Sequence, residues 1–358
     1  MSNYTSKQLR MAVVKYTTKS TANALTVFIV DMLLYLAAIT GAIMLENALA
    51  KIACAVLAGF KIASIFVIAH DAAHDSLTGN RKLNRIIGRI TFLPALHNFS
   101  LWIIAHNRLH HQLANLKGAN SWSPFSKDDY DALPLWRKGL ERLYRSPLGL
   151  GVYYLVERWW KDKFFPYKRL TGEYKPVYWL DFALVAGYLT GFISILLIAG
   201  ATVEHTTAME SVLVGFVIPY VVFNYMMGFT IYQHHTHETI PWFDSNDERQ
   251  VKGASDEVTM HVKYPVWYNL ISHNIMEHTA HHIDPRIPLY NLAEAQADLA
   301  NMLGDDMHCM SFSFRKFLHT LSVCKLYDYE NHCWLDFEGR VTTGIILNRN
   351  EVTYAEAA

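Results

Sequence analysis

The sequence predicts an all-α integral membrane protein: four transmembrane helices in two hairpins, with a cytoplasmic helical cap that carries clustered histidines. Three observations support this fold class. Four stretches are long and apolar, the segments between them differ in their Lys and Arg content, and many of the 18 histidines among 358 residues gather in four short clusters. Acidic and basic residues balance at 32 each, so the net charge does not indicate a nucleic-acid partner.

The four apolar stretches are the predicted transmembrane helices, since a helix needs about 20 mostly apolar residues to cross a bilayer. They are residues 22–44, 49–69, 179–200 and 211–232. Short links (LENALA, GATVEHTTAME) join the first to the second and the third to the fourth, so each pair is a hairpin that enters and leaves on one side. Buried helices of a soluble protein are the alternative, which helix length and charge asymmetry both disfavour.

Charge distribution predicts the orientation. The two hairpin tips, 43–50 and 200–210, contain no Lys or Arg, whereas residues 1–20 contain four and segment 70–178 contains many. Because Lys and Arg accumulate in cytoplasmic loops, both termini and the cap are expected in the cytoplasm. The first apolar run is too long for a cleaved signal and lacks a small-residue cleavage pattern, so we expect it to stay as an anchor. A bacterial inner membrane is the expected location.

The expected organisation has three parts. A cytoplasmic segment 1–21 precedes the main domain 22–305, and a cytoplasmic tail 306–358 follows it. Within the main domain, the cap comprises 70–178 and 233–305. Two of its stretches, 86–106 and 140–168, are rich in apolar or alternating aromatic and basic residues and are expected to lie at the membrane surface.

Two polar features lie apart from the histidines. Asp31 and Lys61 fall within the first two predicted spans at nearly equal depth, roughly 13 Å from the cytoplasmic side, which predicts a buried ion pair. The alternatives are that each residue faces a different neighbour or that Lys61 snorkels. The cysteines are scattered and form no CxxC pair, which argues against a cysteine zinc site or an iron–sulfur cluster and predicts free thiols. They are Cys54, Cys309, Cys324 and Cys333.

The histidine clusters read IAHDAAHDS (68–76), IIAHNRLHHQ (103–112), YQHHTHE (232–238) and IMEHTAHHID (275–284). Histidines three or four residues apart share one face of a helix, an arrangement that binds metals. The first and third clusters end the second and fourth spans, so all four can meet on the cytoplasmic side. Eight expected ligands are His70, His74, His106, His110, His111, His278, His281 and His282.

Eight imidazoles exceed the four ligands of a structural zinc site and suit two metal ions, although imidazole alone does not specify the metal. Asp71, Asp75 and Glu277 adjoin these histidines and are candidates to accept hydrogen bonds from the ring nitrogens. A solvated helix face is the alternative for Asp71 and Glu277.

The motifs HDAAH, HNRLHH and HTAHH resemble the three histidine boxes of the membrane fatty acid desaturases. YQHHTHETIPWF resembles the QHTH…P stretch of the acyl-lipid omega-6 and omega-3 branch, and HNIMEHTAHHIDPRIPLYNLAEA resembles that branch's third box. The resemblance covers about residues 60–300. Within it, His235 matches the first histidine of QHTH and is expected to be a ninth ligand; His237 is expected beside the site and His234 in solvent.

The resemblance implies a di-iron centre held by histidines, with O₂ as co-substrate, that introduces a cis double bond into an acyl chain. It also implies an external electron donor, either a ferredoxin or a cytochrome b5-type protein. The substrate would be a membrane lipid or a fatty acyl group on a carrier. Trp102, Trp122, Trp179 and Trp267 are candidates to line an acyl tunnel, with core packing or interfacial anchoring as the alternative.

Two alternatives remain open at this stage. A hydroxylase, acetylenase, ketolase or alkane monooxygenase would use the same histidine boxes. A histidine-rich metal transporter or sensor belongs to another class, but the spans lack the ligand ladder that an ion pathway needs.

Overall fold

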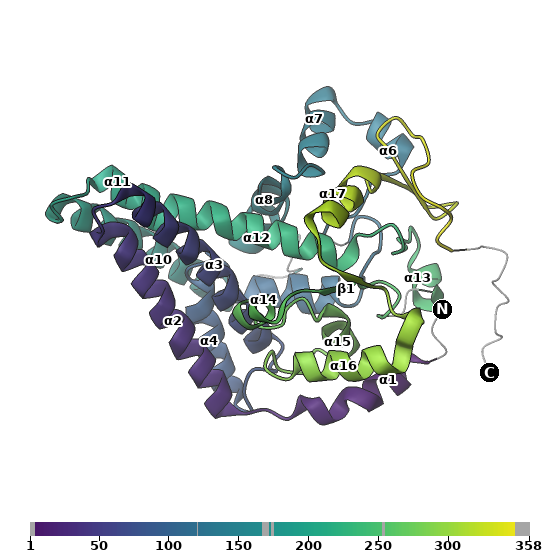
Figure 1. The fold of residues 1–358 in the computed structure, drawn as a ribbon, viewed down its shortest axis with the longest axis horizontal. Coiled ribbons are helices and arrows are strands. Elements are labelled where there is room, and N and C mark those ends of the chain that lie inside the picture. Colours follow the sequence, from purple (N-terminus) through teal and green to yellow (C-terminus); the bar gives the residue numbers. More distant parts are fainter. Residues whose placement is uncertain (1–3, 120, 167–171, 173–174, 253–254, 348–358) are drawn as a thin grey trace.

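The computed structural model describes residues 4–119, 121–166, 172, 175–252 and 255–347. The described chain is mostly helical, and the long helices form one half of the molecule while the short elements form the other (Figure 1). Four helices are long and apolar enough to cross a membrane: Thr21–Met44, Ala48–Ala73, Pro176–Thr202 and Ala208–His235. Each contains one predicted span and extends it by a few residues.

The first two long helices are α2 (Thr21–Met44) and α3 (Ala48–Ala73). Side chains of Ser20 and Asn47 cap their N-termini by accepting hydrogen bonds from the backbone N–H groups of Asn23 and Ala50. The third is α10 (Pro176–Thr202), which begins with a proline at its first turn. The fourth is divided into α11 (Ala208–Val212), the π-helical η4 (Leu213–Val217) and α12 (Ile218–His235).

Helix α3 lies at the centre and packs against α2, α12 and α4 (Arg81–Phe92). Gly59 allows the close approach of α3 to α12, because a Cβ atom there would lie 2.6 Å from Cβ of Val222. The two helix pairs are joined by an ion pair between the first turn of α3 and α11, where Lys51 Nζ lies 2.7 Å from Glu210 Oε1. These contacts fix the ends of α3 and α12 side by side.

The buried ion pair expected inside the spans is present. Lys61 Nζ lies 2.5 Å from Asp31 Oδ1, and both side chains are buried. The second carboxylate oxygen of Asp31 lies 2.6 Å from Nε2 of His273, which the sequence did not indicate. A cluster of one acid and two bases therefore joins α2, α3 and the loop that precedes the third histidine box.

The remaining elements fall mostly in the segments that the sequence predicts to form the cap. Those of its first part are α5 (Phe99–Ile103), the π-helical η2 (Ile104–His110), α6 (Lys127–Asp131), α7 (Leu135–Tyr144), α8 (Leu150–Tyr153) and the π-helical η3 (Tyr154–Phe164). Those of its second part are α13 (Asn246–Lys252), β1 (His261–Lys263), α14 (Val266–Ile271), α15 (His278–Ile283), α16 (Leu292–Leu303) and η5 (Gly304–Asp306).

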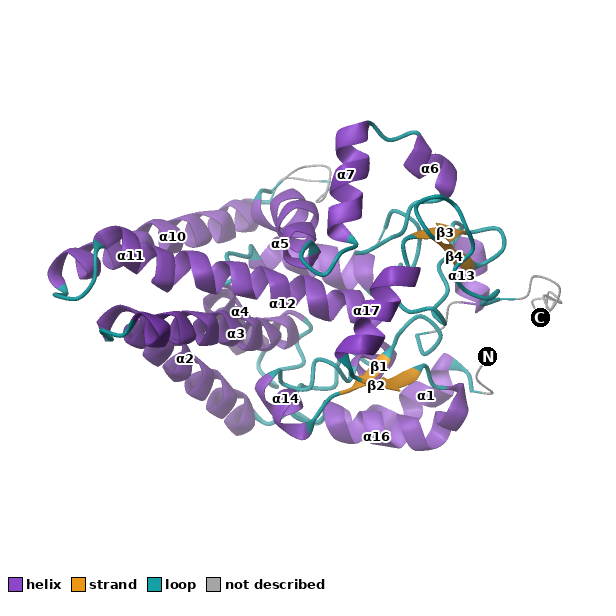
Figure 2. Cartoon of the chain, turned by 45° about the horizontal axis from the view of Figure 1, so that its top comes forward, coloured by secondary structure: helices purple, strands orange, loops and turns teal. Residues whose placement is uncertain are grey.

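Segments at both ends of the chain pack onto this cap. At the N-terminal side, α1 (Ser6–Val13) and η1 (Val14–Thr17) lie along α16, with Leu9 and Val13 in a shared core. At the C-terminal side are β2 (Cys309–Ser311), α17 (Phe314–Val323), β3 (Leu326–Asp328) and β4 (Cys333–Leu335). Strand β2 pairs in parallel with β1, and β3 pairs antiparallel with β4, as Figure 2 shows. The four cysteines are free thiols, as predicted.

Candidate metal centre

Nine histidine rings converge where α3, η2, α12 and α15 meet. Eight of them form two groups in which the nitrogens that could bind a metal lie within 4.8 Å of one another. The first group is His70, His74, His106 and His281, and the second is His110, His235, His278 and His282. The ninth ring, His111, has its Nε2 atom 3.1 Å from those of His106 and His281, which adds it to the first group.

The second group is a chain of close nitrogen contacts. Nε2 of His235 lies 3.0 Å from Nε2 of His278 and 3.2 Å from Nε2 of His110. Nε2 of His110 lies 3.1 Å from that of His282. His235, the last residue of α12, thus sits within the group although it lies outside the three boxes.

The division of the second box between the groups follows from its backbone. Residues Ile104–His110 are π-helical, and the N–H of His111 donates to the carbonyl oxygen of His106, five residues earlier, at 3.1 Å. This pairing brings the Nε2 atoms of His106 and His111 together. The ring of His110 stacks on that of His106 at 4.8 Å, but its nitrogen faces the second group. The expected α-helical spacing does not predict this division.

Two rings have their orientation fixed by an acceptor. Nδ1 of His70 lies 2.9 Å from the Asp71 carboxylate, and Nδ1 of His235 lies 2.9 Å from the carbonyl oxygen of Val258. A neutral imidazole that donates from Nδ1 has its lone pair on Nε2, so both rings direct a lone pair toward the centre.

The two groups fit two metal ions. Two nitrogens about 2.1 Å from one metal and at right angles to each other are about 3.0 Å apart, which matches the 3.0–3.2 Å contacts between Nε2 atoms here. Burial, and then the neighbouring imidazoles, hold the pKa of His106, His111 and His281 well below the usual value. These lowered pKa values favour the neutral form of the three rings, which is the form that binds a metal ion.

The four residues expected to accept hydrogen bonds from the ligand rings or to lie beside the site have different contacts in the structure. Asp71 contacts His70 as described, whereas Asp75 pairs with Arg81 at 3.1 Å. Glu277 lies 2.7 Å from Nε2 of His261. The ring of His237 bonds to the Thr239 hydroxyl at 2.9 Å. Of these four, only Asp71 contacts a ring of the two groups in the contacts that the structure records.

The expectation that His234 lies in solvent is wrong. Its ring is buried and stacks on that of His278 with centroids 3.6 Å apart. The ring is buried because α15 packs over the end of α12. The sequence prediction places this cluster at the protein surface and does not include that contact.

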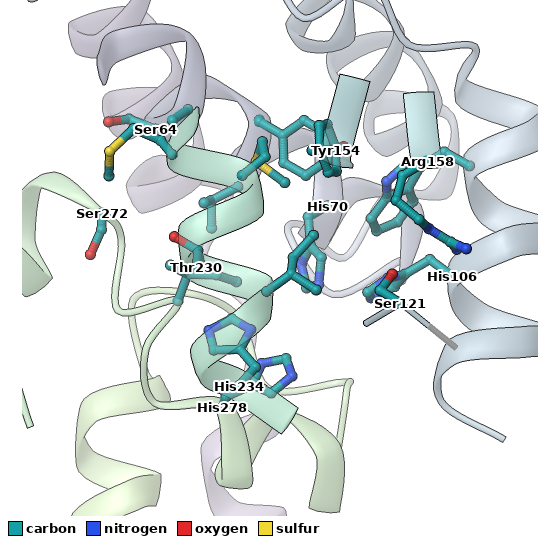
Figure 3. A pocket seen from close by; sticks show the side chains of 18 of the residues that line it. Ser64, His70, His106, Ser121, Tyr154, Arg158, Thr230, His234, Ser272 and His278 are labelled. Atoms are coloured by element: carbon teal, nitrogen blue, oxygen red, sulfur yellow. The ribbon is translucent and has the colours of Figure 1, made fainter. Parts of the chain in front are cut away.

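A largely apolar cavity opens onto both groups (Figure 3). His70, His106, His110 and His278 form part of its wall. Its apolar lining includes Phe60, Ala63, Phe66, Val67, Trp102, Ala105, Met226, Met227, Ile231, Ile271 and Ile275. Of the four candidate tryptophans, Trp102 lines the cavity and stacks on His106, Trp122 is buried in the core, and Trp179 and Trp267 are exposed.

Sequence reasoning missed two residues of this cavity. Arg158 and Lys163 also line it, although their stretch was expected at the membrane surface. Lys163 is 5% exposed. If the stretch RWWKDK is taken as a π-helix, Arg158 and Lys163 come to lie on one face of it. The sequence carries no signal that predicts a π-helix there.

Comparisons with known proteins agree with this geometry. The sequence model of the family described as "Fatty acid desaturase" matches residues 46–313. A chloroplastic omega-6 fatty acid desaturase of Glycine max is 28% identical over 76% of this chain and 61% of its own length. An sn-1 oleoyl-lipid 12-desaturase of Picosynechococcus is 28% identical over 78% of each chain.

A third relative, an sn-1 acyl-lipid omega-3 desaturase (ferredoxin) of Nostoc, is 28% identical over 68% of this chain and 66% of its own. The chain spans about three fifths of the chloroplastic relatives and about three quarters of a cyanobacterial one. The family match includes all three histidine boxes and His235. The chain therefore belongs to the fatty acid desaturase family.

Proposed function

We propose that this protein is an O₂-dependent membrane desaturase that introduces a cis double bond into a lipid-linked acyl chain, with two irons held by nine histidines. The observation that carries the proposal is the placement of two groups of imidazoles at the wall of a largely apolar cavity. The ligands would be His70, His74, His106, His111 and His281 for one iron, and His110, His235, His278 and His282 for the other.

Each part of the chain contributes to this chemistry. The irons would supply, with O₂, the oxidising power that breaking an unactivated C–H bond requires and that side chains lack. Asp71 and the Val258 carbonyl hold two ligand rings in the metal-binding orientation. The apolar walls, including Phe66, Trp102 and Met227, exclude water and position an acyl chain against the histidines.

The proposal includes a membrane topology. The α2–α3 pair and the α10–α12 pair each enter and leave from the cytoplasm, and the cap with its metal centre lies on the cytoplasmic side of a bacterial inner membrane. The distribution of Lys and Arg supports this orientation.

Electrons would come from a separate protein. One relative carries ferredoxin in its name, which favours a ferredoxin as donor over a cytochrome b5-type protein. The basic residues of the cap would suit an acidic carrier.

Expression in a bacterium, followed by gas chromatography–mass spectrometry of its fatty acids, tests the proposal. We expect a new unsaturated fatty acid that depends on iron and O₂. A hydroxylated product would assign the chain to the monooxygenase type of the superfamily. Metal flux without any change in fatty acids would favour the transporter and reject the proposal.

A further inference from the structure

The cavity has one charged end. Arg158 and Lys163 both line it, and both belong to the π-helical segment η3. In a π-helix, residues five apart lie on the same face, so the two side chains share the face that borders the cavity. Lys161 differs: its side chain is 49% exposed and pairs with Glu157.

Of the two basic side chains at this end, one has an ion-pair partner among the described residues. Arg158 lies 3.0 Å from Asp162, which accounts for one cation. Within the described part of the chain, no hydrogen bond or salt bridge of the Lys163 ammonium group is recorded. Burial, and then the neighbouring Arg158, lower the pKa of Lys163 to about 7. A buried ammonium group without a partner is costly, so an anion bound beside it would be favoured.

His70 lies between Arg158 and the side of the cavity that Ser64 lines. In Figure 3, Ser64 and Ser272 lie on one side of the cavity and Arg158 on the other, with His70 between them. The lining continues along α3 to Phe60, ten residues before His70 and so about 15 Å from it along the helix. An acyl chain with its anionic head at Arg158 would therefore pass His70 before it reached Phe60.

We infer that Arg158 and Lys163 bind the anionic group of the acyl substrate, either the phosphate of a glycerophospholipid or the carboxylate of an unesterified fatty acid. The chain's methyl end then points toward Phe60 and Ile271. This inference rests on the proposed function, because it assumes that the cavity holds an acyl chain.

Direct lipid binding to the purified iron-loaded protein in an uncharged detergent tests the inference without turnover. The probes are dioleoylphosphatidylglycerol, oleate and the uncharged dioleoylglycerol. Lys163→Gln and Arg158→Gln should weaken binding of the anionic probe by about tenfold or more, since a hydrogen bond to a charged group contributes roughly 1.5–3 kcal/mol. Binding of dioleoylglycerol should change little.

The matched control is Lys161→Gln, on the same segment but outside the cavity. Lys163→Arg should retain binding, which separates loss of charge from loss of fold. A loss confined to phosphatidylglycerol identifies a phospholipid substrate, and a loss confined to oleate identifies a free fatty acid. Equal weakening by Lys161→Gln, or equal wild-type affinity for all three probes, overturns the inference. Failure of the proposed function would be seen in a different experiment, the bacterial expression test, as unchanged cellular fatty acids.

Discussion

The ring of His234 stacks on that of His278 at 3.6 Å, while Nε2 of the adjacent His235 lies 3.0 Å from Nε2 of the same His278. Two consecutive residues at the end of α12 thus contact one histidine in different ways. One covers the face of the ring, and the other meets its nitrogen.

This difference predicts separate effects on iron binding. His235→Ala should lose one of the two irons per chain, together with activity, because it removes an imidazole from the second group. His234→Phe should keep both irons, because an aromatic ring can still cover His278. Iron per chain, measured by plasma emission spectrometry on purified protein, separates the two. A wild-type iron content in His235→Ala would remove this residue from the ligand set.

His281→Ala should abolish desaturation and lower the iron content of the first group. Its Nε2 lies 3.1 Å from that of His111, so its loss opens a metal position on the side that faces His70. The control is His319→Ala, whose ring is exposed and pairs with Glu238 on the surface. Full activity in His281→Ala, with the control also active, would contradict the assignment of the first group.

The buried cluster of Asp31, Lys61 and His273 should be strongly coupled. Asp31→Asn should destabilise the protein more than Lys61→Met, because it leaves two bases rather than one without their carboxylate. Loss of one partner of a buried pair costs about 3–5 kcal/mol, and the double-mutant coupling should be about 1–3 kcal/mol. Unfolding in mixed micelles of increasing dodecyl sulfate measures both. Strictly additive effects would mean that Asp31 and Lys61 do not interact energetically.

Gly59→Ala should destabilise the protein by about 1–3 kcal/mol, since an added Cβ meets both a side chain and the Pro219 carbonyl oxygen of α12. Because α3 and α12 carry His70 and His235, the variant should also hold less iron. Gly187→Ala is the matched control on α10, where a Cβ has no neighbour within 4 Å. If the two variants have the same thermal stability and iron content, the close contact between α3 and α12 does not require glycine at position 59.

Much of this arrangement follows from the sequence, because it depends on local rules. Hydropathy indicates the four long helices. The nearly equal depth of Asp31 and Lys61 within the first two predicts the contact between them. The histidine motifs identify rings that do converge. The rest depends on contacts that spacing does not encode. The π-helical turn separates the nitrogens of His106 and His110, and the burial of His234 requires α15 to cover α12.

The same limit explains Lys163. An aromatic and basic stretch is typical of a membrane surface, and Trp160 and Lys161 in it are indeed exposed. Only the five-residue repeat of η3 turns Lys163 inward.

The contact between Arg10 and α15 bears on how the protein is made. Nε of Arg10 donates to the carbonyl oxygen of Ile283 at 3.1 Å, directly after the third box, and α1 packs on α16. Helix α1 is synthesised long before α15, so the earlier segment stays unpaired until the later one has left the ribosome. Under the proposed function, the iron site would be completed late in biogenesis, and a fusion partner placed just before Ser6 would interfere with its completion.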